Sequence, residues 1–364
     1  MEETVSRQQF AAVAFCALLS PAIRTIPALV VHLTGEHAYI SVLLSILPLL
    51  ALAALLCHFQ RSLGRGEGMA ELFLRALGKF WGRGLLLAFG LWMLFYCAFV
   101  MRISAHRFIS TIFSASSPPA FIPAMGLLTL MVGMGAFRSL CRLAAIMRPV
   151  LSFTLLAVLL LCLPQVEPYT YSRPLREDLP HIALGVLPVL NALSIWGYLA
   201  FLEGHVDGER PRVRHFAPML LRTVLLLALL CYTTVGSFGP HLADKLSNPF
   251  FVMIRNIRVF TALERVEALV IALWFFTDFI LAGAMLHAGL AALSRALNLE
   301  LKGRLGRGFI LLSVGAITAL ALMLAPGTTA LTDLSMLIIP AVNMLFMFAL
   351  LPGALIIGSL RKRI

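Results

Sequence analysis

Ten long apolar segments separated by polar connections constrain this chain more than any other feature of its sequence. A helix that crosses a lipid bilayer needs about 20 mostly apolar residues. The segments occupy approximately residues 8–33, 38–58, 84–112, 119–136, 139–163, 181–202, 216–238, 264–292, 306–325 and 331–358. Charged residues make up only 13% of the 364 residues, whereas soluble proteins have about 25%. The sequence therefore predicts an all-α integral membrane protein with about ten transmembrane helices.

Basic residues fall mainly in every second connection, counted from the N-terminus. Cytoplasmic loops of membrane proteins carry an excess of lysine and arginine, so both termini are predicted to be cytoplasmic. The same distribution accounts for the formal net charge of +12. Because these charges lie in short connections between apolar segments, no nucleic-acid partner is expected, and the lipid bilayer is the predicted surroundings.

Ten helices with both ends on one side divide into two halves of five with opposite orientation. We expect one transmembrane domain over residues 1–364, with repeat one at about 8–163 and repeat two at about 181–358. The first helix of each half contains an interruption, at Pro21 and Pro27 in one and at Pro188 in the other. Paired interrupted helices in matching positions indicate the midplane site of an inverted-repeat transporter fold.

The interruption in the first helix, Ser20 to Pro27, carries a cation inside an otherwise apolar segment. An arginine at membrane depth usually faces a partner or a watery cavity. Arg24 is therefore either an anchor for a ligand carboxylate or one half of an internal salt bridge. Ser20, Ala22 and Thr25 surround it in sequence and complete the ligand-binding residues predicted on this helix.

Three further helices contribute candidate ligand-binding residues. Asn191 and Ser194 share one face of the sixth segment and either bind a ligand ammonium or amide or join two helices by hydrogen bonds. Tyr96 lies beside an aromatic face in the third segment, where core packing is the alternative. Trp274 belongs to a polar stripe in the eighth segment.

The same polar stripe contains Asp278, a carboxylate that lies deep in the eighth segment. A carboxylate at that depth needs a partner. We expect Arg148, beside Pro149 in the fifth segment, to be this partner. The pair is interpreted either as a structural ion pair or as a coupling or ligand site.

The sequence contains no motif that indicates an enzyme. The nine histidines lack the HExxH spacing, and neither a phosphate-binding loop nor a nucleophile elbow occurs. The six cysteines lie in or at the ends of apolar segments without CxxC pairs, so we expect no metal site and no disulfide framework. No cofactor is expected.

Several diffuse patterns resemble one family of membrane proteins over nearly the whole chain. They are Ser6-Arg7-Gln8-Gln9, Thr25-Ile26-Pro27, Gly135 through Arg142 with Arg148-Pro149, Asn248-Pro249 through Arg255, Glu264 through Glu267, and Trp274. With these residues the chain resembles the B subunit of spore germinant receptors, the endospore germination permease family of the amino acid–polyamine–organocation superfamily.

The resemblance implies a 5+5 inverted-repeat fold of the LeuT/APC type, with broken helices 1 and 6 that bind a nutrient germinant, usually an amino acid. It implies an A-type membrane subunit and a C-type lipoprotein as partners, in the inner membrane of the spore. Superfamily members usually have glycines at the helix-one break, where this chain has Ser20 through Arg24. In some relatives a helix-five cation replaces bound sodium, so Arg148 next to Asp278 predicts sodium independence.

Three functions are compatible with this sequence. The first is a germinant receptor subunit that binds a nutrient and passes a conformational signal to its partners. The second is a proton-coupled secondary amino-acid transporter, which uses the same kind of midplane site. The third is a structural subunit that binds no ligand and holds the other subunits together.

Overall fold

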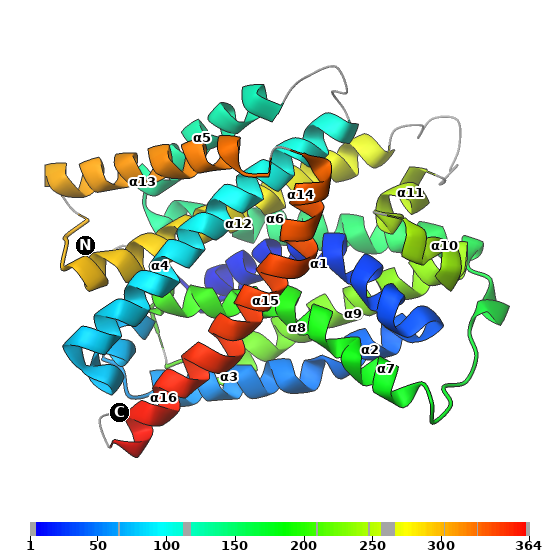
Figure 1. Cartoon of the computed structure of the whole chain (residues 1–364), viewed down its shortest axis with the longest axis horizontal. Coiled ribbons are helices and arrows are strands. Elements are labelled where there is room, and N and C mark those ends of the chain that lie inside the picture. Colours follow the sequence, from blue (N-terminus) through cyan, green and yellow to red (C-terminus); the bar gives the residue numbers. More distant parts are fainter. Residues whose placement is uncertain are drawn as a thin grey trace.

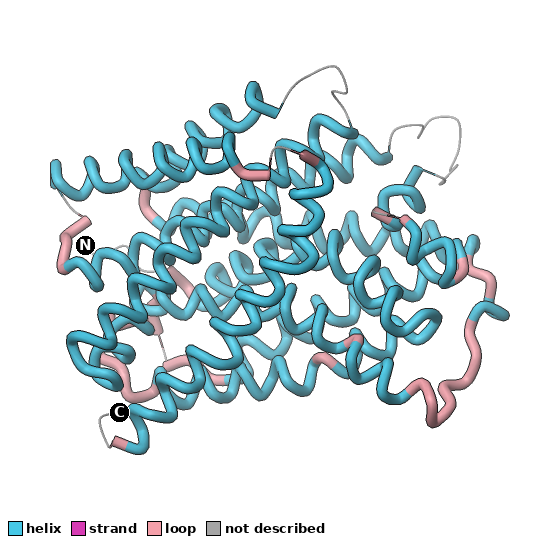
Figure 2. Tube along the Cα trace, viewed as in Figure 1, coloured by secondary structure: helices cyan, strands magenta, loops and turns pink. Residues whose placement is uncertain are grey.

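The computed structural model describes residues 5–64, 66–111, 118–208, 210–246, 248–255, 266–301, 303–325 and 327–361 (Figure 1). Nearly all of these residues are helical, and short loops join the helices (Figure 2). The long helices are α1 (Arg7–Thr34), α3 (Ile46–Gln60), α4 (Met69–Thr111), α5 (Pro118–Met134), α6 (Phe137–Cys162), α9 (Val213–Phe238), α12 (Val266–Leu297) and α13 (Gly303–Met323). The shorter ones are α2 (Ala38–Leu44), α7 (Leu179–Leu184), α8 (Val186–Ser194), α10 (Pro240–Lys245), α11 (Pro249–Arg255), α14 (Thr328–Asp333), α15 (Ile339–Met344) and α16 (Leu351–Leu360).

These helices match the ten predicted segments closely. Within the described residues, eight stretches are long and apolar enough to cross a membrane, and the first of them, Arg7–Gln60, is 54 residues long and contains two of the predicted segments. The fourth predicted segment is the shorter apolar helix Phe121–Met134. The chain is therefore an all-helical, multi-pass membrane protein.

The first helix differs from the expectation of a break. α1 is one helix of 28 residues, with Pro21 and Pro27 inside it. Proline removes one backbone donor, so Pro21 and Pro27 leave the carbonyls of Ala17 and Ile23 without their usual intrahelical partner. The helix nevertheless continues through both prolines, and the Thr25 hydroxyl makes an additional hydrogen bond to the carbonyl oxygen of Pro21 at 2.7 Å. The chain stays helical, so side chains rather than exposed backbone are presented at Ser20 to Arg24.

The sixth segment is interrupted, but by a change in helix type. α7 and α8 are α-helical, and at Ile195 the chain continues as an 11-residue 3₁₀ helix, η4 (Ile195–His205). Runs of 3₁₀ helix longer than three or four residues are uncommon because their hydrogen bonds are poorer. The change in helix type follows directly after Asn191 and Ser194, at a buried position.

Two short helical segments are distinct from the long helices. α4 contains a kink at Gly78, where φ is +81°, so Met69 through Leu77 form a separate arm of this helix. α11 covers Pro249–Arg255.

α1 runs through the centre of the molecule and packs against α6, α8, α9 and α12 (Figure 1). α4 and α12 form the most extensive helix pair, and they approach most closely at two glycines. A Cβ atom on Gly90 would lie 2.6 Å from Leu293 Cγ, and one on Gly289 would lie 3.2 Å from the carbonyl oxygen of Gly90. Small residues permit such close approach between membrane helices.

Replacement of Gly90 by valine is expected to reduce the free energy of unfolding by about 1–3 kcal/mol, because overpacking forces the two helices apart. Denaturation of the purified chain in detergent measures this change. Gly315→Val is the matched control, since a Cβ at Gly315 of α13 has no neighbour within 4 Å. Equal stability of the two variants would contradict the close crossing.

The two ends of the chain lie at the same side of the helix bundle, at the left in Figure 1. There the N-terminal residues bind the end of η4. The Val5 N–H donates to the His205 carbonyl at 2.9 Å, and the Asp207 N–H donates to the Val5 carbonyl at 2.9 Å. Arg7 forms an ion pair with the buried carboxylate of Glu203. These contacts attach the start of α1 to the end of the sixth segment.

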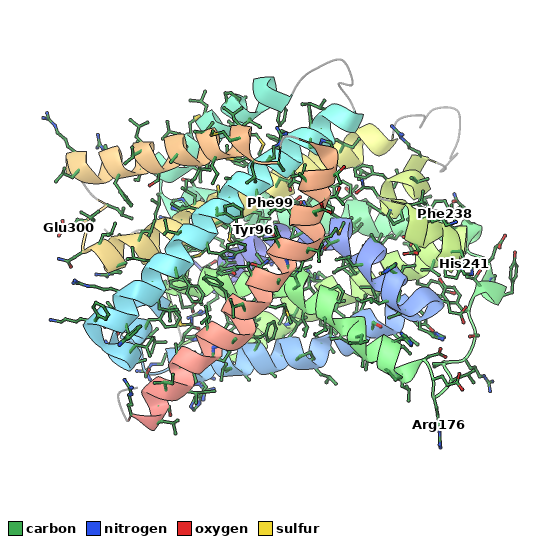
Figure 3. All side chains as sticks on the ribbon, viewed as in Figure 1. Tyr96, Phe99, Arg176, Phe238, His241 and Glu300 are labelled. Atoms are coloured by element: carbon green, nitrogen blue, oxygen red, sulfur yellow. The ribbon has the colours of Figure 1, made fainter. Side chains whose placement is uncertain are left out.

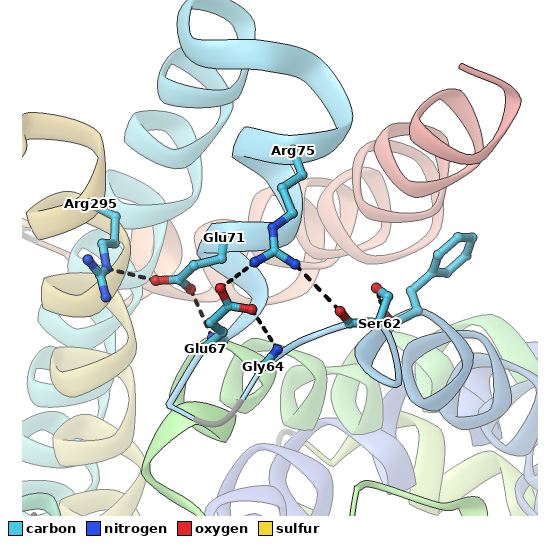
Figure 4. Close-up of polar contacts among 8 residues, drawn as sticks. Ser62, Gly64, Glu67, Glu71, Arg75 and Arg295 are labelled. Atoms are coloured by element: carbon cyan, nitrogen blue, oxygen red, sulfur yellow. Dashed lines mark hydrogen bonds and ion pairs between the residues drawn. The ribbon is translucent and has the colours of Figure 1, made fainter. Parts of the chain in front are cut away.

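A second group of ion pairs lies at the start of α4. Arg295 Nε of α12 is 2.8 Å from Glu71 Oε1, and Arg75 pairs with Glu67, whose other oxygen accepts from the Gly64 N–H (Figure 4). A Cβ on Gly68 would lie 2.8 Å from the Phe201 carbonyl. This loop therefore packs directly on η4 and closes the bundle from the same side.

Candidate binding site at the centre of the bundle

A cluster of polar side chains from three helices lies in the apolar centre of the bundle. Asp278 of α12 is 2% exposed, and its two oxygens face different partners. One accepts a hydrogen bond from the hydroxyl of Ser20 on α1, and the other is 3.4 Å from Arg107 Nη1 on α4. Arg107 Nη2 also lies 3.5 Å from Ser20 Oγ. A carboxylate at this depth requires such partners, and α1, α4 and α12 each supply part of the set.

A second guanidinium group lies beside this cluster. Arg24, one helical turn beyond Ser20, lies over the ring of Phe99 with 5.4 Å between its Cζ and the ring centroid. It lies within electrostatic range of Arg107 and Asp278. Its Nε is buried and has no hydrogen-bond partner among the described residues. Tyr96 packs on Phe99 at 5.8 Å, and both lie on α4 near the middle of the molecule (Figure 3).

Arg24 differs from Arg107 in its surroundings. Its Nε is buried and has no hydrogen-bond partner among the described residues. Burial of a charged group without such a partner is costly in an apolar interior. The arrangement is suited to a small anionic group, because a carboxylate can accept several hydrogen bonds from guanidinium groups.

Trp274 connects the polar cluster to an apolar pocket. Arg107 lies over its ring at 4.9 Å, and Phe251 packs against it at 4.5 Å. On its other side lies a pocket of about 40 Å³, formed by Leu19 and Ile23 of α1 together with residues of α6, α11 and α12. That volume exceeds the 10–15 Å³ or so that a water molecule needs, and its lining is almost entirely apolar.

The remaining predicted residues differ in their surroundings. Ala22 is fully buried in the core, and the Thr25 hydroxyl is used within α1. Ser194 Oγ donates to the Asn191 carbonyl at 3.2 Å within the sixth segment. Asn191 Oδ1 is buried without a hydrogen-bond partner among the described residues. Within that part of the chain, no hydrogen bond joins Asn191 or Ser194 to Ser20, Arg24 or Asp278.

The predicted pairing of Arg148 with Asp278 is wrong. Asp278 is paired with Arg107, whereas Arg148 of α6 lines a different cavity near Arg7 and Arg222. The expectation of sodium independence rested on Arg148 lying next to Asp278, so the geometry gives it no support. α6 carries Leu151 and Leu155 toward α1 at the level of the central pocket.

Arg107 is the site residue that the sequence reasoning missed. It follows Tyr96 by eleven residues and Phe99 by eight, and these intervals place all three side chains on one face of α4. Ser20 and Arg24 are four residues apart on α1, and Trp274 and Asp278 are four apart on α12. The spacing of these residues on α1, α4 and α12 could therefore have indicated that Arg107 belongs to the site.

A separate polar network joins three other helices. Trp92 Nε1 of α4 donates to the Tyr198 hydroxyl at 2.8 Å and to Asn343 Oδ1 at 3.1 Å, and the Tyr198 hydroxyl donates to the same Asn343 oxygen at 3.0 Å. Tyr198 belongs to η4 and Asn343 to α15. This network holds the 3₁₀ segment against the bundle beyond the change in helix type.

The fold is that of a LeuT-type transporter. A Na⁺-coupled sialic acid symporter, in its substrate-bound outward-open state, superimposes with a TM-score of 0.66 over 99% of this chain and 90% of the symporter chain. The sequence identity is 13%, so the likeness concerns the fold alone.

Residues 4–330 match the family described as spore germination protein, and the chain belongs to this family. A relative from Bacillus subtilis (strain 168), the putative spore germination protein YfkT, is 22% identical over 262 residues, which cover 70% of each protein. The resemblance found in the sequence is thereby confirmed, and the family is one of permease-like membrane proteins rather than of enzymes.

Proposed function

We propose that this chain is the nutrient-binding membrane subunit of a spore germinant receptor and that its ligand is an amino acid held at the centre of the bundle. The observation that carries the proposal is the buried guanidinium group of Arg24, whose Nε has no hydrogen-bond partner among the described residues. The ligand carboxylate would bind Arg24 and neutralise its charge. Family membership supports a role in spore germination.

The ammonium group and the side chain of an amino acid would also find suitable partners in this site. The sixth segment packs against α1, and the buried Asn191 Oδ1 on it offers an acceptor for the ligand ammonium. The apolar pocket beside Trp274 is suited to a small apolar side chain. In this proposal the site lies between α1 and the sixth segment, which comprises α7, α8 and η4, and α4 and α12 complete it.

In this proposal an A-type membrane subunit and a C-type lipoprotein are the partners, in the inner membrane of the spore, with both termini in the cytoplasm. Residues 8–163 and 181–358 are the two inverted repeats. A ligand shifts a conformational equilibrium only by its difference in affinity for the two states. The amino acid therefore has to bind one arrangement of α1 and the sixth segment more tightly than the other.

The test is equilibrium binding of labelled amino acids to the purified full chain, with nucleosides and sugars as comparison ligands. We expect saturable binding of an amino acid with an apolar side chain, and weak competition by the corresponding amino-acid amide. The amide keeps the ammonium and the side chain but lacks the negative charge. Equal competition by acid and amide would contradict the role of Arg24. Binding of a nucleoside alone would contradict the ligand class.

The likeness to a symporter fold favours a second candidate, a proton-coupled amino-acid transporter. Uptake of labelled amino acid into liposomes that contain only this chain distinguishes the two. Saturable uptake driven by a proton gradient would favour the transporter. Binding without uptake, together with loss of the nutrient response in spores that lack the chain, would favour the receptor subunit.

A further inference from the structure

A cavity of about 380 Å³ lies between the N-terminal part of α1, the middle of α6 and the first turns of α9. It is separate from the central cluster and its lining is strongly basic. The cavity is bordered by four arginines and one histidine, which are Arg7, Arg148, Arg214, Arg222 and His215. Arg7 pairs with Glu203. Among the described residues neither Arg148 nor Arg222 has a carboxylate partner within ion-pair distance.

The arginines of this cavity lie well inside their helices. Arg222 follows Val213, the first residue of α9, by nine residues, which corresponds to about 13 Å along an α-helix. Arg148 lies eleven residues beyond Phe137, the first residue of α6, or about 16 Å along the axis. Both arginines therefore lie more than two helical turns inside their helices.

Arg222 is exposed on α9. Leu225, three residues further along the same side of this helix, is 52% exposed, as expected for a side chain that contacts lipid. Arg148 is half-buried on α6 and borders the cavity from the inside. A cationic side chain among lipid-facing residues is costly unless an anion or the interface compensates it.

We propose that this cavity binds a phosphate anion, with Arg148 and Arg222 as its inner ligands and Arg214 at its outer rim. Arginine binds phosphate through paired N–H donors, and basic pockets between transmembrane helices bind the headgroups of anionic lipids. The phosphate belongs either to an anionic phospholipid or to a small soluble compound. The open apolar flanks of the cavity match the acyl chains of a lipid.

Native mass spectrometry of the full chain in detergent tests the proposal, with phosphatidylglycerol and phosphatidylcholine as probes. We expect the wild-type chain to retain phosphatidylglycerol at least about tenfold more strongly. Each of Arg148→Gln and Arg222→Gln should weaken this binding about fivefold, the effect of about one arginine at an anionic membrane surface. Arg222→Lys, which keeps the charge, should retain most of it.

Arg142→Gln is the matched control, because Arg142 is an exposed arginine on the same helix as Arg148 but does not line the cavity. Inorganic phosphate forms the second arm. If phosphate alone binds the detergent-purified chain and displaces the lipid, the ligand is a soluble phosphate. Absence of lipid preference together with absence of phosphate binding would overturn the proposal. An effect of Arg142→Gln as large as that of the cavity variants would overturn it as well.

Discussion

Replacement of Asp278 by asparagine is expected to reduce the free energy of unfolding by about 3–5 kcal/mol, the cost of breaking a buried ion pair by removal of one partner. Asp278 is 2% exposed and faces both Arg107 and Ser20. Without the carboxylate of Asp278, Arg107 would lose this ion pair. Because proteins are stable by only about 5–15 kcal/mol, this variant should be strongly depleted in membranes.

Denaturation of the purified chain in detergent measures the effect. Asp333→Asn is the control, since Asp333 is an exposed acid on α14. The double variant Asp278→Asn with Arg107→Gln should recover part of the loss, because it removes one of the two buried cations. If Asp278→Asn and Asp333→Asn were equally stable, the carboxylate of Asp278 would not be needed to stabilise the fold.

The second large effect concerns Arg24 and ligand affinity. In the proposed site, Arg24→Gln should weaken amino-acid binding by a factor of at least about 30, since removal of one partner from a buried charge pair costs about 2–5 kcal/mol of affinity. The stability of the unliganded chain should not fall, because the substitution also removes repulsion between Arg24 and Arg107. Equilibrium binding and unfolding in detergent measure the two quantities separately.

Arg24→Lys should restore part of the affinity, and Arg142→Gln should leave it unchanged. The combination of lost affinity and retained stability distinguishes a ligand anchor from a structural cation. If Arg24→Gln destabilised the unliganded chain as much as Asp278→Asn, Arg24 would belong to the structural ion-pair cluster. Unchanged affinity would move the ligand carboxylate elsewhere.

The membrane-crossing segments could be predicted because their signal is local. Twenty or so apolar residues define a helix wherever it lies in the bundle, and the observed helices α6 and α9 begin and end within three residues of the predicted segments. The presence of a buried charge on α12 could also be predicted, since Asp278 lies in an apolar run. The apolar segments do not indicate how each helix is rotated about its own axis.

The partner of Asp278 depended on that rotation. Arg148 and Arg107 are both arginines in apolar segments, and only the packing of α4 against α12 selects Arg107. The prolines of α1 are a second point at which the structure differs from the prediction, because the predicted break is absent and α1 is a continuous helix. Proline predicts a lost hydrogen bond to the carbonyl four residues before it, but whether the helix opens there depends on its packing, and α1 is packed by α6, α9 and α12.

The 3₁₀ segment η4 has a mechanical consequence. A 3₁₀ helix rises about 2.0 Å per residue and an α-helix about 1.5 Å, so the 11 residues of η4 would shorten by about 5 Å if they rewound into an α-helix. Trp92 and Asn343 hold η4 at Tyr198, its fourth residue, so about 3–4 Å of this change falls beyond that point. The far end of η4 carries Glu203 and His205, to which Arg7 and Val5 are attached. Rewinding would therefore pull on the start of α1, and a small rearrangement beside Asn191 would become a displacement of several ångströms at the surface where both termini lie.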